Sequence, residues 1–250
     1  MPPPLLVDAD ATLGRNPRAD VGDGGVTALL ERMDRVGVAA ALVGHSWSRL
    51  HDPATGNALV SRLVAGRPRL AACWTLLPPG TGETGGPGEF ARSAREHRVR
   101  GVRAYPADHG YELAGPDAAP MFAALAEAGL PLLLDAPQAG WPEVEALARR
   151  HPSLPVVVGR AGYRVLRRVA GVLERTGNVY VGTADLSSHR GLEWLAERFG
   201  PGRLVFGTGM PERDPAESVT RLLWSELPGE AVAAIGAGTL ATLTDLDGLT

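Results

Sequence analysis

Short apolar segments alternate with amphipathic segments along the whole chain, and this alternation is the feature that most restricts the fold. Eight segments have the length and composition of buried strands: residues 5–8, 38–44, 69–77, 99–104, 130–135, 155–159, 178–183 and 204–207. Between them, apolar residues recur at helical spacing, as at Leu166, Val169 and Leu173. Strands that alternate with helices are typical of a parallel sheet.

Eight strand–helix units in 250 residues predict a closed (β/α)8 barrel, also called a TIM barrel. We expect one domain over residues 1–250, with a short helical tail over residues 230–250. An open doubly wound sheet is the alternative. That fold normally has a short glycine-rich turn after its first strand, whereas residues 12–25 here form a long polar loop.

The charge pattern argues against several classes of partner. The formal net charge is -3, and no basic stripe or block indicates nucleic-acid binding. No stretch is long and apolar enough to cross a bilayer, and the N-terminal residues lack the pattern of a signal peptide. We therefore expect a soluble, cytoplasmic protein that binds a small-molecule substrate, with no nucleic acid or membrane as partner.

The types of basic and sulfur-containing residues restrict the chemistry further. All 25 basic residues are arginine, so a Schiff-base lysine is excluded. Cys73 is the only cysteine, and it lies within an apolar segment. We expect it to pack as a small buried side chain rather than to act as a nucleophile.

Functional side chains of a TIM barrel lie at the carboxyl ends of its strands. Asp8 and Asp10 end the first predicted strand, and we expect both to face the same side because they are two positions apart. Two neighbouring carboxylates can differ in pKa and act as acid and base. The alternative is that one of them binds backbone amides of the following loop.

Asp135 and Arg160 end the fifth and sixth predicted strands. They form either a structural ion pair across the barrel mouth or a site for substrate. His109 lies in a predicted loop beside Tyr105 and Tyr111, which shape a pocket around it. The other candidates near strand ends are Arg103, His45 and Asp185.

Spacing gives little sign of a metal site, because the chain has no HxH motif, no HExxH motif and no cysteine cluster.

Several stretches resemble the amidohydrolase superfamily, in particular the small amidohydrolase-related branch of TIM-barrel metal-dependent hydrolases. The stretches GVRAYPADHGYELAGP, HPSLPVVVGRAG and ERFGPGRLVFGTGMP are the strongest, and the resemblance extends over nearly the whole chain. Members of that family carry HxH at the end of strand 1, histidines ending strands 5 and 6, and an aspartate after the GT of strand 8. This sequence has Asp8-Ala9-Asp10, Asp135, Arg160 and Gly209 at those positions.

The resemblance therefore implies the scaffold without the usual zinc-hydroxide mechanism. We expect an atypical enzyme that needs neither metal nor other cofactor and acts on a small carboxylate-bearing molecule. Amide or lactone hydrolysis, decarboxylation, isomerisation and cyclisation remain alternatives. The expected catalytic residues are Asp8, Asp10, Asp135 and His109; the expected substrate-binding residues are Arg160, Arg103, Tyr105, His45, Tyr111 and Asp185.

Two other hypotheses remain. The chain is either an inactive homologue that binds a ligand or a partner protein, or it holds one divalent metal ion on Asp8, Asp10 and Asp135 through their oxygen atoms. Members of this fold often pair, so a homodimer is a further expectation.

Overall fold

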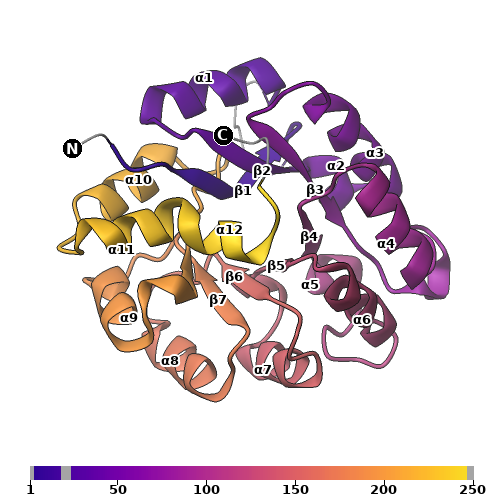
Figure 1. The fold of residues 1–250 in the computed structure, drawn as a ribbon. Coiled ribbons are helices and arrows are strands. Elements are labelled where there is room, and N and C mark those ends of the chain that lie inside the picture. Colours follow the sequence, from indigo (N-terminus) through magenta and orange to yellow (C-terminus); the bar gives the residue numbers. More distant parts are fainter. Residues whose placement is uncertain (1–2, 18–23, 247–250) are drawn as a thin grey trace.

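Eight parallel strands, each followed by helical structure, form a nearly closed barrel in the computed structural model (Figure 1). The structure describes residues 3–17 and 24–246, so the predicted loop over residues 12–25 lies partly outside the described residues. The strands are β1 (Val7–Leu13), β2 (Ala40–His45), β3 (Leu70–Thr75), β4 (Gly101–Ala104), β5 (Leu132–Asp135), β6 (Val156–Gly159), β7 (Val179–Gly182) and β8 (Leu204–Val205). This architecture confirms the predicted (β/α)8 barrel.

Neighbouring strands pair in sequence order, and backbone bonds bring the two ends of the sheet together. The Ala9 N–H donates to the Phe206 carbonyl oxygen at 3.0 Å, and the Thr12 N–H donates to that of Met210 at 2.9 Å. These bonds hold β1 against the segment that continues β8. All strands therefore end at one rim, which is the barrel mouth.

Helices accompany the strands within the described residues, and most of them surround the barrel on its outside (Figure 1). They are α1 (Val26–Val36), α2 (Ser46–Leu50), α3 (Pro53–Val64), α4 (Pro87–Glu96), α5 (Pro106–His109), α6 (Ala119–Ala128), α7 (Trp141–Arg150), α8 (Leu166–Arg175), α9 (Gly191–Phe199), α10 (Pro215–Leu223), α11 (Gly229–Ala233) and α12 (Thr239–Leu243). The short α2 and α5 were not predicted, because four or five residues are too few to show helical periodicity. His109 ends α5 and does not lie in a loop.

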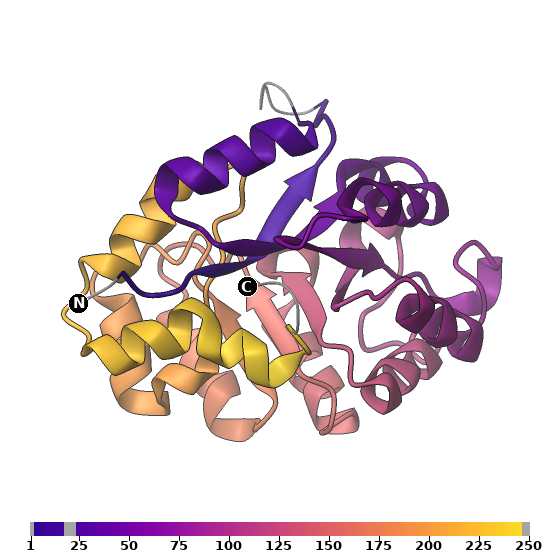
Figure 2. The same cartoon turned by 45° about the horizontal axis from the view of Figure 1, so that its top comes forward.

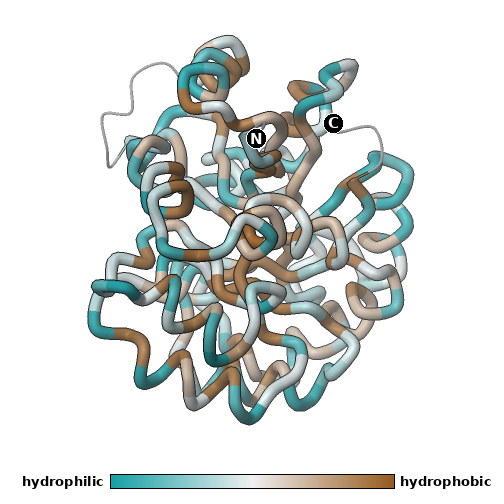
Figure 3. Tube along the Cα trace, turned by 60° about the vertical axis from the view of Figure 1, so that its left-hand side comes forward, coloured by the Kyte–Doolittle hydropathy of each residue, from teal (hydrophilic) through white to brown (hydrophobic). Residues whose placement is uncertain are grey.

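The apolar side chains form two layers. A large outer layer lies between strands and helices, and a smaller inner layer fills the barrel. Cys73 belongs to the inner layer and is buried, as predicted. Apolar segments accordingly gather in the interior of the trace in Figure 3.

The C-terminal helical segment, residues 229–243, lies across the end of the barrel opposite the mouth (Figure 2). Its Ala237, Leu240 and Leu243 pack with inner-layer residues such as Val7 and Ala40. This segment agrees with the helical tail predicted from residue 230, of which residues 247–250 lie outside the described part. None of the helices within the described residues is long and apolar enough to cross a membrane.

Candidate active site

A buried arginine stands at the centre of the barrel mouth. Arg103 lies on β4, where its position two residues after Gly101 directs it into the barrel. One Nη donates to Asp135 Oδ1 at 3.1 Å, and the other donates to Asp10 Oδ1 at 2.8 Å and to the Ala9 carbonyl oxygen at 3.3 Å. Arg103 therefore joins the carboxyl ends of β1 and β5.

Arg160 provides a second guanidinium between the same two carboxylates. Its Nε lies 3.4 Å from Asp10 Oδ2 and 3.6 Å from Asp135 Oδ2, and its Nη1 donates to Glu212 Oε2. Its side chain is 14% exposed, against 5% for Arg103, so Arg160 reaches the rim. Arg160 also has φ +52°, a conformation that costs a non-glycine residue about 1–3 kcal/mol and is typical of functional sites.

The two carboxyl groups at the mouth have different protonation behaviour. Burial alone would raise the pKa of Asp10, but Arg103 and Arg160 outweigh it and lower that pKa to about 2. Burial raises the pKa of Asp135, and the neighbouring Asp10 charge adds to this effect although the arginines oppose it. One carboxylate is thus held as an anion while the other binds a proton more readily, which is the arrangement of an acid–base pair.

Little space remains beside this pair. A cavity of about 20 Å³ is lined by Asp10, Arg103 and Asp135 and by small residues such as Gly159 and Gly207. A single water molecule needs roughly 10–15 Å³ on the same measure. A larger ligand can therefore enter only if side chains at the mouth move.

Asp8 does not belong to this cluster, and the prediction that Asp8 and Asp10 face the same side is wrong. Pairing between β1 and β2 shifts register between Asp8 and Ala11, and both Ala9 and Asp10 line the cavity. Such a bulge reverses the alternation of side chains along a strand. Asp8 instead lies on the outer face of β1.

The buried Asp8 links β1 to the residues that follow β8. Its carboxylate accepts bonds from the Asp10 N–H at 2.8 Å, the Thr208 N–H at 2.9 Å and the Thr208 hydroxyl at 2.5 Å. Burial raises the pKa of Asp8 to about 6 despite these bonds, with the Asp10 charge acting in the same direction. Asp8 therefore serves the geometry of the strand pair. It does bind backbone amides, but these belong to Asp10 on β1 and to Thr208 after β8, and not to the loop that follows β1 as the alternative supposed.

Both predicted histidines lie away from the cluster. His45 Nδ1 accepts a bond from the Trp47 N–H at the start of α2, and His109 Nε2 donates to the Arg49 carbonyl oxygen at 3.0 Å. Burial lowers the pKa of both imidazoles. They hold α2 and α5 in place rather than touching Asp10 or Asp135.

The remaining predicted residues have separate places. Tyr105 is buried under Arg49, whose guanidinium lies 5.0 Å from its ring, and burial raises its pKa. Tyr111 packs against the outer apolar layer, and burial raises its pKa as well. Asp185 pairs with Arg213 at 3.1 Å on the rim. None of the three lines the cavity beside Asp135.

Two residues of the site were not predicted. Arg49 bonds Asp108 through Nε at 2.6 Å, and its Nη1 lies 3.9 Å from Asp135. Glu212 binds Arg160 and also accepts a bond from the Asn16 side chain at 2.6 Å. Burial would raise the pKa of Glu212, but Arg160 outweighs it and lowers that pKa.

Comparisons with known proteins agree with this architecture. A family model described as "Amidohydrolase" matches residues 4–242. No curated protein matches the sequence. Three solved structures share the fold. The 5-carboxyvanillate decarboxylase from Sphingomonas paucimobilis is 18% identical with a TM-score of 0.76, and the match covers 96% of this chain and 98% of that one. The 2,6-dihydroxybenzoate decarboxylase from Rhizobium is 14% identical with a TM-score of 0.75 (99% of this chain and 100% of that one), and the 5-carboxyvanillate decarboxylase from Novosphingobium aromaticivorans is 15% identical with a TM-score of 0.70 (96% of this chain and 95% of that one).

The comparisons contradict the prediction that no cofactor is involved. The N. aromaticivorans decarboxylase was crystallised twice with manganese and a nitrobenzoic acid, and the second of these structures is of its D314N mutant. Relatives with this fold thus point to a divalent metal ion.

The side chains at the mouth of this chain do not fit such an ion. Among residues 3–17 and 24–246, no group of three or more His, Cys, Asp and Glu side chains is arranged to hold a metal. Asp10 and Asp135 are bound by arginines, and the Asp8 carboxylate faces away from them. The alternative of an ion held by these three aspartates therefore has no geometric support.

Proposed function

The chain belongs to the amidohydrolase family, and from this premise we propose that it is an enzyme that acts on a small carboxylate-bearing molecule, with Asp135 as its acid–base group. Decarboxylation is the reaction that the site suits best. The observation that carries the proposal is the buried pair of Asp10 and Asp135, which lies between two shared guanidinium groups. The arginines lower the pKa of Asp10, whereas burial and the Asp10 charge raise that of Asp135.

Asp135 has the chemistry to supply the proton that decarboxylation consumes. When the bond between carbon and the carboxylate breaks, carbon dioxide leaves and the electron pair stays on the substrate carbon. A proton must then reach that carbon. A protonated Asp135 donates it and becomes a carboxylate, which Arg103 stabilises.

The two arginines have different roles in this proposal. Arg103 is fixed by three bonds and holds Asp10 and Asp135 in place. Arg160 is the more exposed group, and its planar guanidinium can exchange a protein carboxylate for the substrate carboxylate by bidentate bonds.

The size of the cavity favours a second candidate function, namely ligand binding without turnover. About 20 Å³ accommodates no organic substrate, and Arg160 is held by Asp10, Asp135 and Glu212 together. An inactive homologue would keep this network as an internal ion cluster. It would show ligand binding at most, with no product.

Carbon dioxide release from aromatic carboxylates tests the proposal. The panel includes 2,6-dihydroxybenzoate and 5-carboxyvanillate, with Mn²⁺ supplied because relatives were crystallised with it. The Asp135→Asn variant should lose at least about 100-fold in kcat, the usual contribution of a general acid. The matched control is Asp34→Asn, which removes a carboxylate that binds Arg69 on the protein surface.

The two candidate functions give different results in this assay. Turnover by the wild type, retained in the Asp34→Asn variant and lost in the Asp135→Asn variant, supports the acid–base role. Full activity of the Asp135→Asn variant would contradict that role. Binding without product formation across the panel would favour the inactive homologue.

A further inference from the structure

A second polar site lies beside the mouth, in a groove between α7 and α8. The groove measures about 800 Å³, within the range of about 300–1,000 Å³ that is typical of small-molecule sites. Its charged lining comprises four arginines and one glutamate: Arg160, Arg164, Arg168, Arg175 and Glu145. The groove therefore carries a strong excess of positive charge in a protein whose net charge is negative.

Two of these arginines have no acidic partner within the described part of the chain. Arg175 is bound by Glu145, and Arg160 belongs to the cluster at the mouth. Arg164 and Arg168 form no ion pair with any described carboxylate. Their positive charge is thus available to an external anion.

The groove also offers aromatic surfaces. Trp141 is half-buried at the start of α7, and Tyr163 is 65% exposed in the loop before α8. The Arg164 guanidinium lies 5.6 Å from the centre of the Tyr163 ring, so the cation and the ring form one surface. A planar aromatic ligand with anionic substituents matches both features.

The first turn of α8 is consistent with an anion at this place. It contains Arg167 and Arg168, no acidic residue and no side-chain cap. Cations there oppose the helix dipole and are unfavourable, whereas an anion near them would be favourable. This arrangement adds to the evidence from the groove lining.

We propose that the groove between α7 and α8 is a binding site for aromatic carboxylates, with Arg164 and Arg168 as anion ligands and Trp141 and Tyr163 as contact surfaces. Arg160 lines the groove and also belongs to the ion cluster at the mouth. A dicarboxylate bound by Arg164 and Arg168 can therefore extend towards Arg160. The proposal concerns binding and stands whether or not the mouth catalyses decarboxylation.

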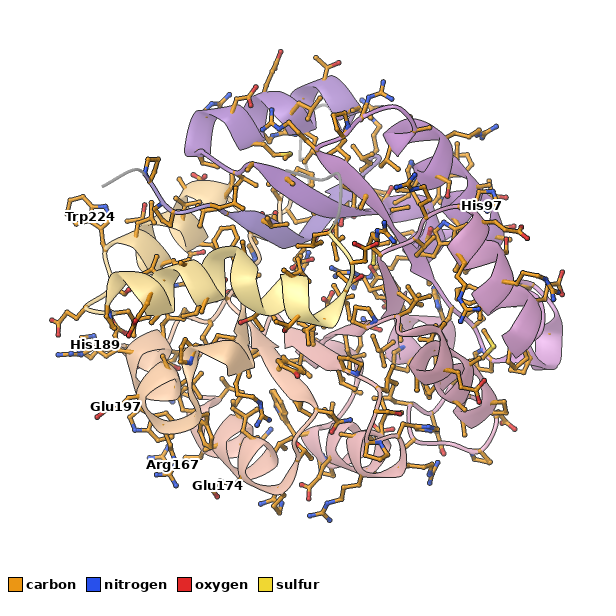
Figure 4. All side chains as sticks on the ribbon, in the orientation of Figure 1. His97, Arg167, Glu174, His189, Glu197 and Trp224 are labelled. Carbon is orange, nitrogen blue, oxygen red and sulfur yellow. The ribbon has the colours of Figure 1, made fainter. Side chains whose placement is uncertain are left out.

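Calorimetric titration of the full chain with isophthalate, a planar dianion, tests the proposal. Replacing Arg164 or Arg168 by Gln should raise Kd about tenfold or more, since hydrogen bonds to charged groups contribute about that much. The matched control is Arg167→Gln. Arg167 neighbours Arg168 on the same helix but lines the adjacent groove between α8 and α9, and Figure 4 shows it projecting outward.

Two further measurements separate a built site from general attraction to positive charge. Uncharged isophthalamide should give no heat of binding, and the Tyr163→Ala variant should bind isophthalate more weakly. Equal weakening by Arg167→Gln and Arg168→Gln would overturn the proposal, as would equal binding of isophthalate and isophthalamide. Absence of binding by the wild type at millimolar isophthalate would also overturn it.

Discussion

Asp8 and Asp10 lie two positions apart, yet their environments move their pKa values in opposite directions. Burial raises the pKa of Asp8 to about 6, whereas the arginines lower that of Asp10 to about 2. A carboxyl with a raised pKa binds protons more tightly in the folded state, so its contribution to stability declines as pH rises. Asp10 contributes in the opposite sense, because its stabilisation is lost as pH falls towards 2.

Replacing Asp8 by Asn should remove the first of these effects. The amide keeps an oxygen that can accept the N–H bonds of Asp10 and Thr208. The wild type should therefore lose stability relative to this variant as pH rises from about 4 to about 6. Urea unfolding at several pH values measures the difference. A difference that is independent of pH would contradict the raised pKa.

The sequence predicted some site residues because the fold determines where strand ends lie. Arg103, Asp135 and Arg160 follow from the strand pattern alone, and the structure brings them together. The bulge that separates Asp8 from Asp10 depends on pairing between β1 and β2, which no local pattern reveals. Chemical roles at the mouth remain predictions for all of these residues.

At the scale of elements, long periodic segments were predicted well and short ones were not. Helix α8 covers Leu166–Arg175 and includes Leu166, Val169 and Leu173, whose spacing predicted a helix. Helix α2 has five residues and carries Arg49 to the mouth, and the loop after β8 carries Glu212 there. These two residues were missed because a short helix and an irregular loop have no periodic signal.

The C-terminal segment allows a test of element packing. Leu240 of α12 is 1% exposed and packs with the inner layer of the barrel. Replacing it by Ala should lower the free energy of unfolding by about 2–5 kcal/mol, as for other buried leucines. Denaturant unfolding measures this change. Leu223→Ala on α10, where the side chain is 41% exposed, is the control and should have a much smaller effect.

An equal effect of the two leucine substitutions would contradict the packing of Leu240 against the inner layer of the barrel.

At the scale of the whole molecule, the alternation of eight strand–helix units was enough to predict the barrel, and the family match agrees with it. The sequence encodes the function less directly than it encodes the fold. Three carboxylates and two guanidiniums, from Asp10, Asp135, Glu212, Arg103 and Arg160, share one small volume. Their protonation depends on distances of a few ångströms between distant parts of the chain, which sequence patterns do not give.

The central claim is that the mouth holds one fixed anion and one carboxyl that binds protons readily. Carbon-13 NMR titration of the aspartate carboxyl groups tests it most directly, with resonances assigned through the Asp10→Asn and Asp135→Asn variants. Asp135 should titrate above the ordinary aspartate pKa of 3.8 and Asp10 below it. Titration of both groups near 3.8, or Asp10 above Asp135, would contradict the proposed acid–base pair.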